Sequence, residues 1–259
     1  MTDPYAHLAD RYLEHLSATL RGRVRTELVW RQLRAHLPPP PARVVDVGGG
    51  AGHQARRLAA AGYDVVLLDP SEAMLRRAAE ALADDPSPAR SRVRLVRGRG
   101  QDAVSLLGAA RFDVALCHGV VMYLDDPAPL CDSLGGLLRP AGVGSVLAKN
   151  AEALALRPAL QGRWDDALAA FGTDRDIGAL GVRTRGDTLA GLHGALRGGG
   201  LEPTAWYGVR VLTDHLFGRG SGDDLETVLA AEWEAGTRDP YRRVGRLLHV
   251  LAVRTVPGA

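Results

Sequence analysis

The chain has 259 residues, 46% of them hydrophobic, and its 32 Lys and Arg against 30 Asp and Glu leave a formal net charge of +2. This length suits one large domain, or a core domain with an insertion. The balanced charge gives no support for non-specific nucleic-acid binding, and two cysteines make neither a disulfide framework nor a metal site. No apolar run reaches about 18 residues and no signal pattern opens the chain, so we expect a cytoplasmic protein without a membrane span.

Residues 1–41 are expected to form a helical arm. Apolar residues recur at three- and four-residue spacings between positions 5 and 36, which is the period of a helix packed on one side. Gly22 is expected at a joint between two helices. Four prolines at 38–41 end the arm, because they cannot continue a helix.

The stretch 44–54 reads as an apolar strand carrying Asp46, then a glycine turn, then a helix. Strand, glycine turn and helix open nucleotide-binding α/β domains, because glycine permits a tight turn and the helix N-terminus offers unpaired N–H groups. A second apolar strand, 63–68, ends in Asp69, where an acid that binds a ribose is expected. The glycines of the turn are Gly48, Gly49, Gly50 and Gly52.

The spacing D-x-G-x-G-x-G from Asp46 to Gly52 resembles the first motif of class I S-adenosylmethionine-dependent methyltransferases. A dinucleotide fingerprint has G-x-G-x-x-G, and its last glycine would fall at position 53, which is His. The resemblance implies S-adenosylmethionine as cofactor and an α/β fold with a doubly wound, seven-stranded, Rossmann-like sheet. A nicotinamide or flavin enzyme and a glycine loop that binds nothing are the alternatives.

Strand and helix patterns continue to residue 150, so we expect a cofactor-binding core over 42–150. His118 follows a strand, at the sheet edge where α/β proteins present groups to ligands. Gln101 and Asp102 also follow a strand end, and in class I methyltransferases that position contacts the adenine. Asp102 could also simply cap the next helix. Strands are predicted at 93–97, 112–117 and 142–148, and helices at 70–83, 102–107 and 128–138.

Residues 151–186 interrupt the alternation and are expected to form a cap over the substrate pocket, since such insertions carry specificity. We expect one helix at 158–171 and a polar loop from 172 to 186. Residues 187–259 are expected to complete the sheet with an antiparallel pair of strands. Their predicted elements are a helix at 187–196 capped by Asp187, a strand at 204–212, a helix at 223–234 and a strand at about 247–254.

Several stretches spread over nearly the whole chain resemble a narrower family, the tRNA 5-carboxymethoxyuridine methyltransferases, which methylate a wobble-uridine carboxylate to an ester. The resemblance implies cofactor contacts from Arg25, Gly49, Gly50, Asp69, Gly100, Gln101 and His118. The similar stretches are Arg25 with 29–33, 46–54, 100–102, His118, Asn150, 208–211, and 239–241 with 245–246 and His249.

One segment departs from that family, which carries a lysine-rich basic stretch after the fifth strand. Here the matching segment 172–178 places Asp174 and Asp176 beside Arg175, and phosphate neutralisation supplies much of the affinity for nucleic acid. The acceptor is therefore either tRNA or a small carboxylic or phenolic metabolite. A third possibility is a degenerate methyltransferase fold that serves as a binding subunit. The intact glycine motif argues against this possibility.

A carboxylate acceptor is already ionised at neutral pH, because its reference pKa is about 4, so it needs no general base. The enzyme must hold and align the anion, and an arginine fork is suited to this. Arg210, near Tyr207, is the first candidate, followed by Arg246 and Tyr241. Lys149 is the only lysine, so nearly all basic residues of this chain are arginines. The alternative for each candidate is therefore an ordinary exposed residue.

Overall fold

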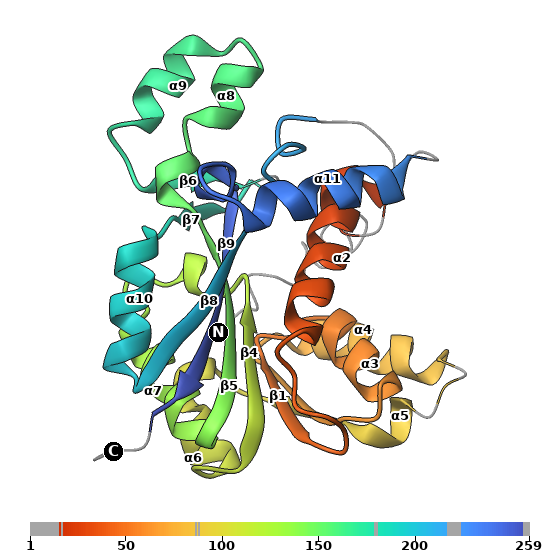
Figure 1. Cartoon of the computed structure of the whole chain (residues 1–259). Helices are drawn as coiled ribbons and strands as arrows, with labels where there is room; N and C mark the ends of the chain where they lie inside the picture. The colour runs from red at the N-terminus through yellow and green to blue at the C-terminus, as the bar shows by residue number, and fades with distance from the viewer. Residues whose placement is uncertain are drawn as a thin grey trace.

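The computed structural model describes residues 16, 18–85, 87, 89–178, 181–216 and 224–255. Its centre is a seven-stranded sheet in the order β3-β2-β1-β4-β5-β9-β8 (Figure 1). The neighbours from β3 to β5 are parallel, and β9 is antiparallel to both β5 and β8. The predicted doubly wound sheet and its late antiparallel pair are confirmed. The strands are β1 (Arg43–Val47), β2 (Asp64–Asp69), β3 (Val93–Arg97), β4 (Phe112–His118), β5 (Leu138–Lys149), β8 (Leu201–Val209) and β9 (Leu247–Arg254).

Helices cover both faces of this sheet, and one apolar core lies on each face (Figure 1). One face carries α6 (Ala103–Leu107), α7 (Ala128–Leu137) and α10 (Leu189–Gly198). The central strands are buried on both faces, which is why they read as continuous apolar runs. The other face carries α2 (Leu20–Arg34), α3 (His53–Ala60), α4 (Glu72–Ala83) and α5 (Ala89–Arg92), with α11 (Leu225–Thr237) packed on α2.

Two predicted boundaries near helix starts are wrong. α2 begins at Leu20, and its N-cap is Thr19, which has an extended backbone and a hydroxyl that accepts the Gly22 amide. Gly22 therefore lies in the first turn and not at a joint. The cap of α10 is Thr188 and not Asp187, because the Thr188 hydroxyl accepts the Gly191 amide. The part of the predicted arm before residue 16 lies outside the described residues.

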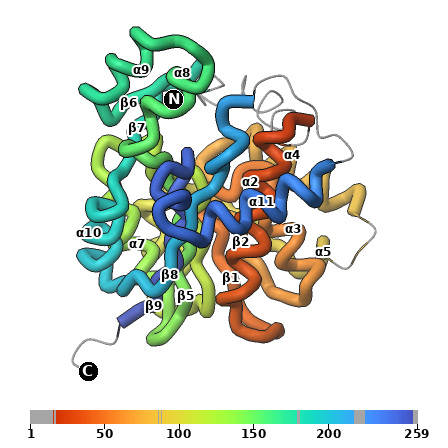
Figure 2. Tube along the Cα trace, turned by 45° about the horizontal axis from the view of Figure 1, so that its top comes forward, coloured from red at the N-terminus to blue at the C-terminus, as the bar shows by residue number. Residues whose placement is uncertain are grey.

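The segment 151–186 projects beyond one end of the sheet (Figures 1 and 2). The predicted single helix is instead two, α8 (Leu156–Leu160) and α9 (Trp164–Ala170), separated at Gly162 with φ +72°. The predicted loop contains an antiparallel pair, β6 (Arg175–Ile177) and β7 (Arg183–Arg185). That this segment caps a substrate pocket, and that units end at 41, 150 and 186, remain predictions.

Candidate active site

The turn after β1 has a shape that side chains would obstruct. Gly48, Gly50 and Gly52 have φ of +70°, +56° and +78°, the left-handed region that favours glycine. A Cβ at Gly48 would lie 2.3 Å from Cγ2 of Val120, so this position needs glycine for space as well. The turn therefore brings bare backbone to the carboxyl edge of the sheet.

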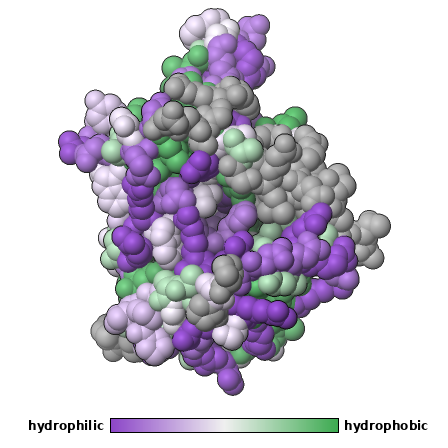
Figure 3. Space-filling model, turned by 90° about the vertical axis from the view of Figure 1, so that its right-hand side faces the viewer, coloured by the Kyte–Doolittle hydropathy of each residue, from purple (hydrophilic) through white to green (hydrophobic). Residues whose placement is uncertain are grey.

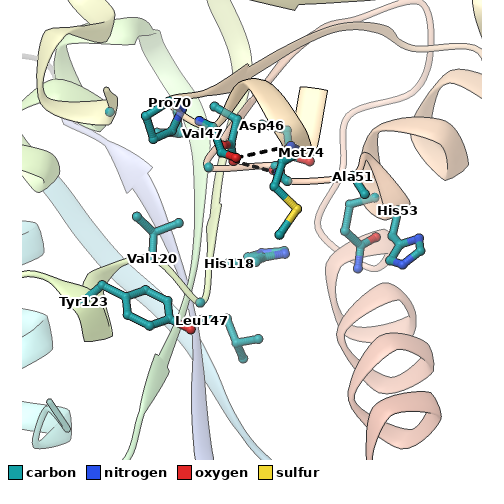
Figure 4. A pocket seen from close by; sticks show the side chains of 18 of the residues that line it. Asp46, Val47, Ala51, His53, Pro70, Met74, His118, Val120, Tyr123 and Leu147 are labelled. Atoms are coloured by element: carbon teal, nitrogen blue, oxygen red, sulfur yellow. Dashed lines mark hydrogen bonds between the residues drawn. The ribbon is translucent and has the colours of Figure 1, made fainter. Parts of the chain in front are cut away.

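A cavity of about 380 Å³ lies at that edge, beside the glycine turn and the ends of β2 and β4. This volume lies within the range of small-molecule sites, about 300–1,000 Å³. In Figure 4, Val120, Tyr123 and Leu147 lie on one side and His53 on the other, with His118 and Met74 between. The predicted cofactor residues that line the cavity are Arg25, Asp46, Gly48, Gly49, Gly50, Asp69, Gly100, Gln101 and His118.

Two buried carboxylates of the cavity have different surroundings. The oxygens of Asp69 accept the backbone amides of Gly50, at 2.9 Å, and Ser71, at 2.8 Å, which holds the carboxylate in one orientation. Asp46 is 2% exposed. Its burial, and then the charge of Asp69, raises the pKa of the Asp46 carboxyl to about 7. The cavity therefore favours a cation near Asp46.

Three buried polar atoms of residues that line the cavity have no hydrogen-bond partner among the described residues. They are Nε2 of His53, Oε1 of Gln54 and Nδ1 of His118. Buried polar atoms are nearly always paired, so such atoms around a cavity indicate a binding site for a polar ligand. Together with the apolar Met74 and Val120, they fit a cofactor with polar, apolar and cationic parts, as S-adenosylmethionine has.

Two predicted cofactor residues do not line the cavity. Gly52 lies behind the turn, at the start of α3, where its left-handed backbone begins the helix. Asp102 is exposed, and although it stands at the N-cap of α6, its side chain makes no capping hydrogen bond. Its position therefore does not support the contact with the cofactor, and the capping role lacks its side-chain hydrogen bond.

The predicted acceptor residues also lie away from the cavity. Tyr207 points from β8 onto the face covered by α2, and its hydroxyl lies 2.8 Å from Nε2 of His36. Tyr241 is 58% exposed. Neither of these side chains lines the cavity. β8 is the edge strand beyond β5 and β9, and the turn that carries Tyr241 packs on it, whereas the cavity lies at the ends of β1, β2 and β4.

Arg210 and Arg246 meet instead in a second place, which we call the basic cluster: Arg21, Lys149, Arg157, Arg210 and Arg246 around Asp176 and Asp214. Asp214 accepts Nε of Arg157 at 2.6 Å and lies 3.3 Å from Nε of Arg210. Asp176 is 3.1 Å from the Lys149 ammonium and also pairs with Arg246. Most of these cations are nearly buried, so their charges are weakly screened.

The pKa values in the basic cluster reflect crowding of positive charge. Burial, and then the charge of Arg246, lowers the pKa of Lys149 to about 8 despite its pairing with Asp176. Burial also lowers the pKa of Arg210 to about 10, although Asp214 opposes this. Asp214 itself has a pKa lowered to about 2, because the charges of the arginines outweigh its burial. The cluster therefore favours added negative charge.

Two elements connect the basic cluster to the cavity. On α2, Arg25 lines the cavity and Arg21 lies one turn earlier on the same face, about 6 Å along the helix axis. On β5, Leu147 lines the cavity, and Lys149 lies two residues on, about 7 Å away on the same strand face. The cluster and the cavity are therefore neighbours.

Several site residues were not predicted. His53, Gln54 and Met74 line the cavity from the first turns of α3 and α4. A signal existed for the first two, since helix N-termini after such turns face the ligand. Arg157 and Asp214 had none, because their partners are distant in sequence.

Comparison with known proteins agrees with this geometry. Residues 45–143, from β1 into β5, match the model of a methyltransferase domain family. Over 254 residues, 95% of this chain and 94% of its relative, the chain is 28% identical to tRNA 5-carboxymethoxyuridine methyltransferase of Escherichia coli O157:H7. The identity and coverage are the same for the enzyme of the same name from Escherichia coli strain K12.

Solved structures share the fold. An S-adenosylmethionine-dependent methyltransferase of Mesorhizobium loti superposes with a TM-score of 0.58 at 22% identity, over 88% of this chain and 98% of that one. The 1,6-didemethyltoxoflavin-N1-methyltransferase of Burkholderia thailandensis, solved with S-adenosylhomocysteine bound, superposes with a TM-score of 0.58 at 20% identity. The superposition covers 99% of this chain and 92% of that one.

The described residues lack two kinds of feature. No helix among them is long and apolar enough to cross a membrane. Within the same ranges, no three His, Cys, Asp or Glu side chains are grouped so that they could hold a metal ion.

Proposed function

We propose that this chain is a class I S-adenosylmethionine-dependent methyltransferase that transfers the methyl group to a carboxylate, forming an ester. The acceptor that we propose first is 5-carboxymethoxyuridine in tRNA. The relative that is 28% identical over 95% of the chain carries that activity in its name, and this likeness supports the assignment.

The cofactor, when bound, supplies an electrophilic methyl group on a sulfonium. Two backbone amides orient the Asp69 carboxylate. We propose that this carboxylate accepts hydrogen bonds from the ribose hydroxyls. The negative charge of Asp69, and that of Asp46 when it is ionised, favours a cation in the cavity. The chain itself need not remove a proton, because a carboxylate acceptor is already a nucleophile at neutral pH.

The observation that carries the proposal is the basic cluster beside the cavity. Lys149, Arg210 and Arg246 share Asp176 and Asp214 with Arg157. This positive region favours an anionic acceptor, and orienting that acceptor supplies several kcal/mol of rate enhancement. Arg210 also has φ +57°, a strained conformation for a residue with a side chain. Such strain concentrates at functional sites.

A small carboxylate metabolite is the second candidate, and the charge of segment 151–186 favours it. A tRNA enzyme must neutralise phosphates, yet the arginines of this segment are matched in number by its acids. The arginines are 157, 163, 175, 183 and 185, and the acids are Glu152 and Asp165, 166, 174 and 176.

The test uses S-adenosylmethionine labelled in its methyl group, with tRNA bearing 5-carboxymethoxyuridine and, separately, a small-molecule extract of cells. Mild alkali hydrolyses a methyl ester and releases labelled methanol, whereas methyl groups on nitrogen, carbon or ether oxygen stay bound. We expect alkali-labile label in the tRNA. Labile label only in small molecules would assign the metabolite, and alkali-stable label in every fraction would refute carboxylate methylation.

The basic cluster is tested by Arg210→Gln, with Arg243→Gln as the matched control on the surface. We expect the KM for the carboxylate acceptor to rise at least tenfold in Arg210→Gln, with the Kd for S-adenosylmethionine within twofold of wild type. An unchanged acceptor KM would remove the cluster from substrate binding.

A further inference from the structure

A chain of hydrogen bonds runs from the cofactor cavity through the sheet to α2. Nε2 of His118 lies 2.8 Å from the hydroxyl of Ser145. The same hydroxyl lies 2.8 Å from Nε2 of His249, whose Nδ1 lies 2.7 Å from Oε1 of Gln32. Four residues from four elements thus form one line, which we call the buried chain.

The strand register explains why these side chains meet. His118, Ser145 and His249 belong to the neighbouring strands β4, β5 and β9, and alternation turns them all toward the face that α2 covers. Gln32 reaches them from α2. Gln32, Ser145 and His249 are fully buried, so water cannot replace any link. His118 alone reaches the cavity.

Counting protons along the buried chain gives its direction. Burial lowers the pKa of both imidazoles, so each ring is neutral and has one N–H and one lone pair. Gln32 places Oε1, which only accepts, beside Nδ1 of His249, and its Nε2 has no hydrogen-bond partner among the described residues. In this orientation of the amide, Nδ1 of His249 carries the proton and its Nε2 accepts. The single Ser145 proton must then go to His249, which leaves the Ser145 oxygen to accept from His118.

We propose that the buried chain holds His118 in its Nε2–H tautomer, so that an unprotonated Nδ1 is available as a hydrogen-bond acceptor for the bound cofactor. Nδ1 is the ring nitrogen without a partner among the described residues. Gln32, Ser145 and His249 are thus positioning residues. This inference concerns the cofactor cavity and does not depend on which acceptor is methylated.

The tautomer has a chemical consequence for what His118 can bind. A lone pair on Nδ1 accepts from an N–H or O–H donor, such as the ammonium of the cofactor, and cannot donate to a carboxylate. The opposite tautomer would present an N–H at the same position and favour an anion. The buried chain therefore assigns His118 to cofactor recognition and excludes it as the holder of a carboxylate.

The wild-type protein, labelled with ¹⁵N in histidine, tests the tautomer directly by NMR. Protonated and unprotonated ring nitrogens have well-separated ¹⁵N shifts, and His118→Gln identifies the signals of His118. We expect a proton on Nε2 and none on Nδ1. A proton on Nδ1 in the wild-type protein would overturn the proposal.

Two variants test whether the chain sets the tautomer. Ser145→Ala removes the central link and Gln32→Met the distant end, and in both we expect the ¹⁵N shifts of His118 to move toward a mixture of tautomers. The Kd for S-adenosylmethionine should weaken about three- to tenfold in Ser145→Ala, the size of one net hydrogen bond.

Ser133→Ala is the matched control, because Ser133 is also buried but its hydroxyl has no described partner. Its His118 shifts should equal those of wild type. Unchanged ¹⁵N shifts of His118 in both Ser145→Ala and Gln32→Met would show that the buried chain does not set the tautomer. If circular dichroism shows that Ser145→Ala does not fold, the wild-type NMR spectrum and the His118 shifts of Gln32→Met test the proposal.

Discussion

Asp69 and Asp46 show how neighbouring carboxylates are differentiated by their surroundings. Backbone amides of Gly50 and Ser71 donate to Asp69 and stabilise its charge. No backbone amide of the described residues donates to the Asp46 side chain, which is 2% exposed. The two residues therefore respond differently to substitution.

Asp69→Ala should weaken the binding of S-adenosylmethionine at least tenfold. A hydrogen bond to a charged group contributes about 1.5–3 kcal/mol, and 1.4 kcal/mol is a factor of ten. Calorimetric titration measures this. Asp64→Ala is the control, because Asp64 lies at the other end of β2 and pairs with Arg92 at 2.8 Å on the surface. Equal affinities of the two variants would exclude the role of Asp69.

Asp46→Asn should change how stability depends on pH. The pKa of Asp46 is about 7 in the folded protein, against a reference of 3.8. Between these values the folded state holds a proton that the unfolded state has lost, so the free energy of unfolding falls as pH rises. Asparagine does not ionise, so its burial carries no cost that grows with pH. We therefore expect the Tm of Asp46→Asn, relative to wild type without cofactor, to rise progressively from pH 5 to pH 8, as scanning calorimetry would show. A constant difference would contradict the raised pKa.

At the level of elements, α11 positions the loop that follows β8. Glu232 of α11 is fully buried, and its carboxylate accepts the amides of Val211, Leu212 and Thr213 at 2.8–3.1 Å. It also accepts the Thr213 hydroxyl at 2.6 Å. This loop joins Arg210 to Asp214, so one helix residue holds part of the basic cluster.

Glu232→Gln should lower stability and acceptor binding together. The amide has one acceptor oxygen in place of two, so at least one buried donor loses its partner, at a cost of about 1–3 kcal/mol. A Tm lower by roughly 3–10 °C is expected for a domain of this size, with a raised acceptor KM. Glu234→Gln, on the exposed side of α11 where it pairs with Arg238, should match wild type in both. An unaltered Tm in Glu232→Gln would show that these bonds do not stabilise the loop.

At the scale of the whole molecule, basic and acidic residues are nearly balanced in number. Hydrophilic residues cover much of the described part of the face in Figure 3, and the formal net charge is only +2. Asp176, one of the two acids that count against RNA binding in the sequence, is paired with Lys149 and Arg246. The basic cluster still holds more cations than carboxylates, so a net positive charge remains there.

The salt dependence of the reaction should distinguish the two acceptors. Log affinity for nucleic acid falls with log salt by about 0.7–0.9 per phosphate contact. Segment 151–186 has exposed arginines at 163, 175 and 183, so we expect a slope of roughly 2–3 for the KM of tRNA. Arg183→Ala should reduce the slope by nearly one. A small carboxylate held by the buried cluster should show a far shallower slope. A salt-independent KM for tRNA would contradict phosphate recognition by this segment.

The sequence alone determined the α/β sheet, the glycine turn and the methyl-donor class. Each depends on local patterns: the period-2 and helical spacing of apolar residues, the need for glycine at Gly48 and Gly50, and Asp69 at a strand end. His118 was also identifiable, because the carboxyl end of a parallel strand always faces the ligand edge.

Only the tertiary structure decided which distant side chains meet. Arg210 and Tyr207 are three residues apart, yet one joins the basic cluster and the other packs under α2, because β8 ends between them. Gln32 and His249, 217 positions apart, touch only because β9 enters the sheet between β5 and β8. Such contacts follow from strand order and burial, which no local spacing encodes.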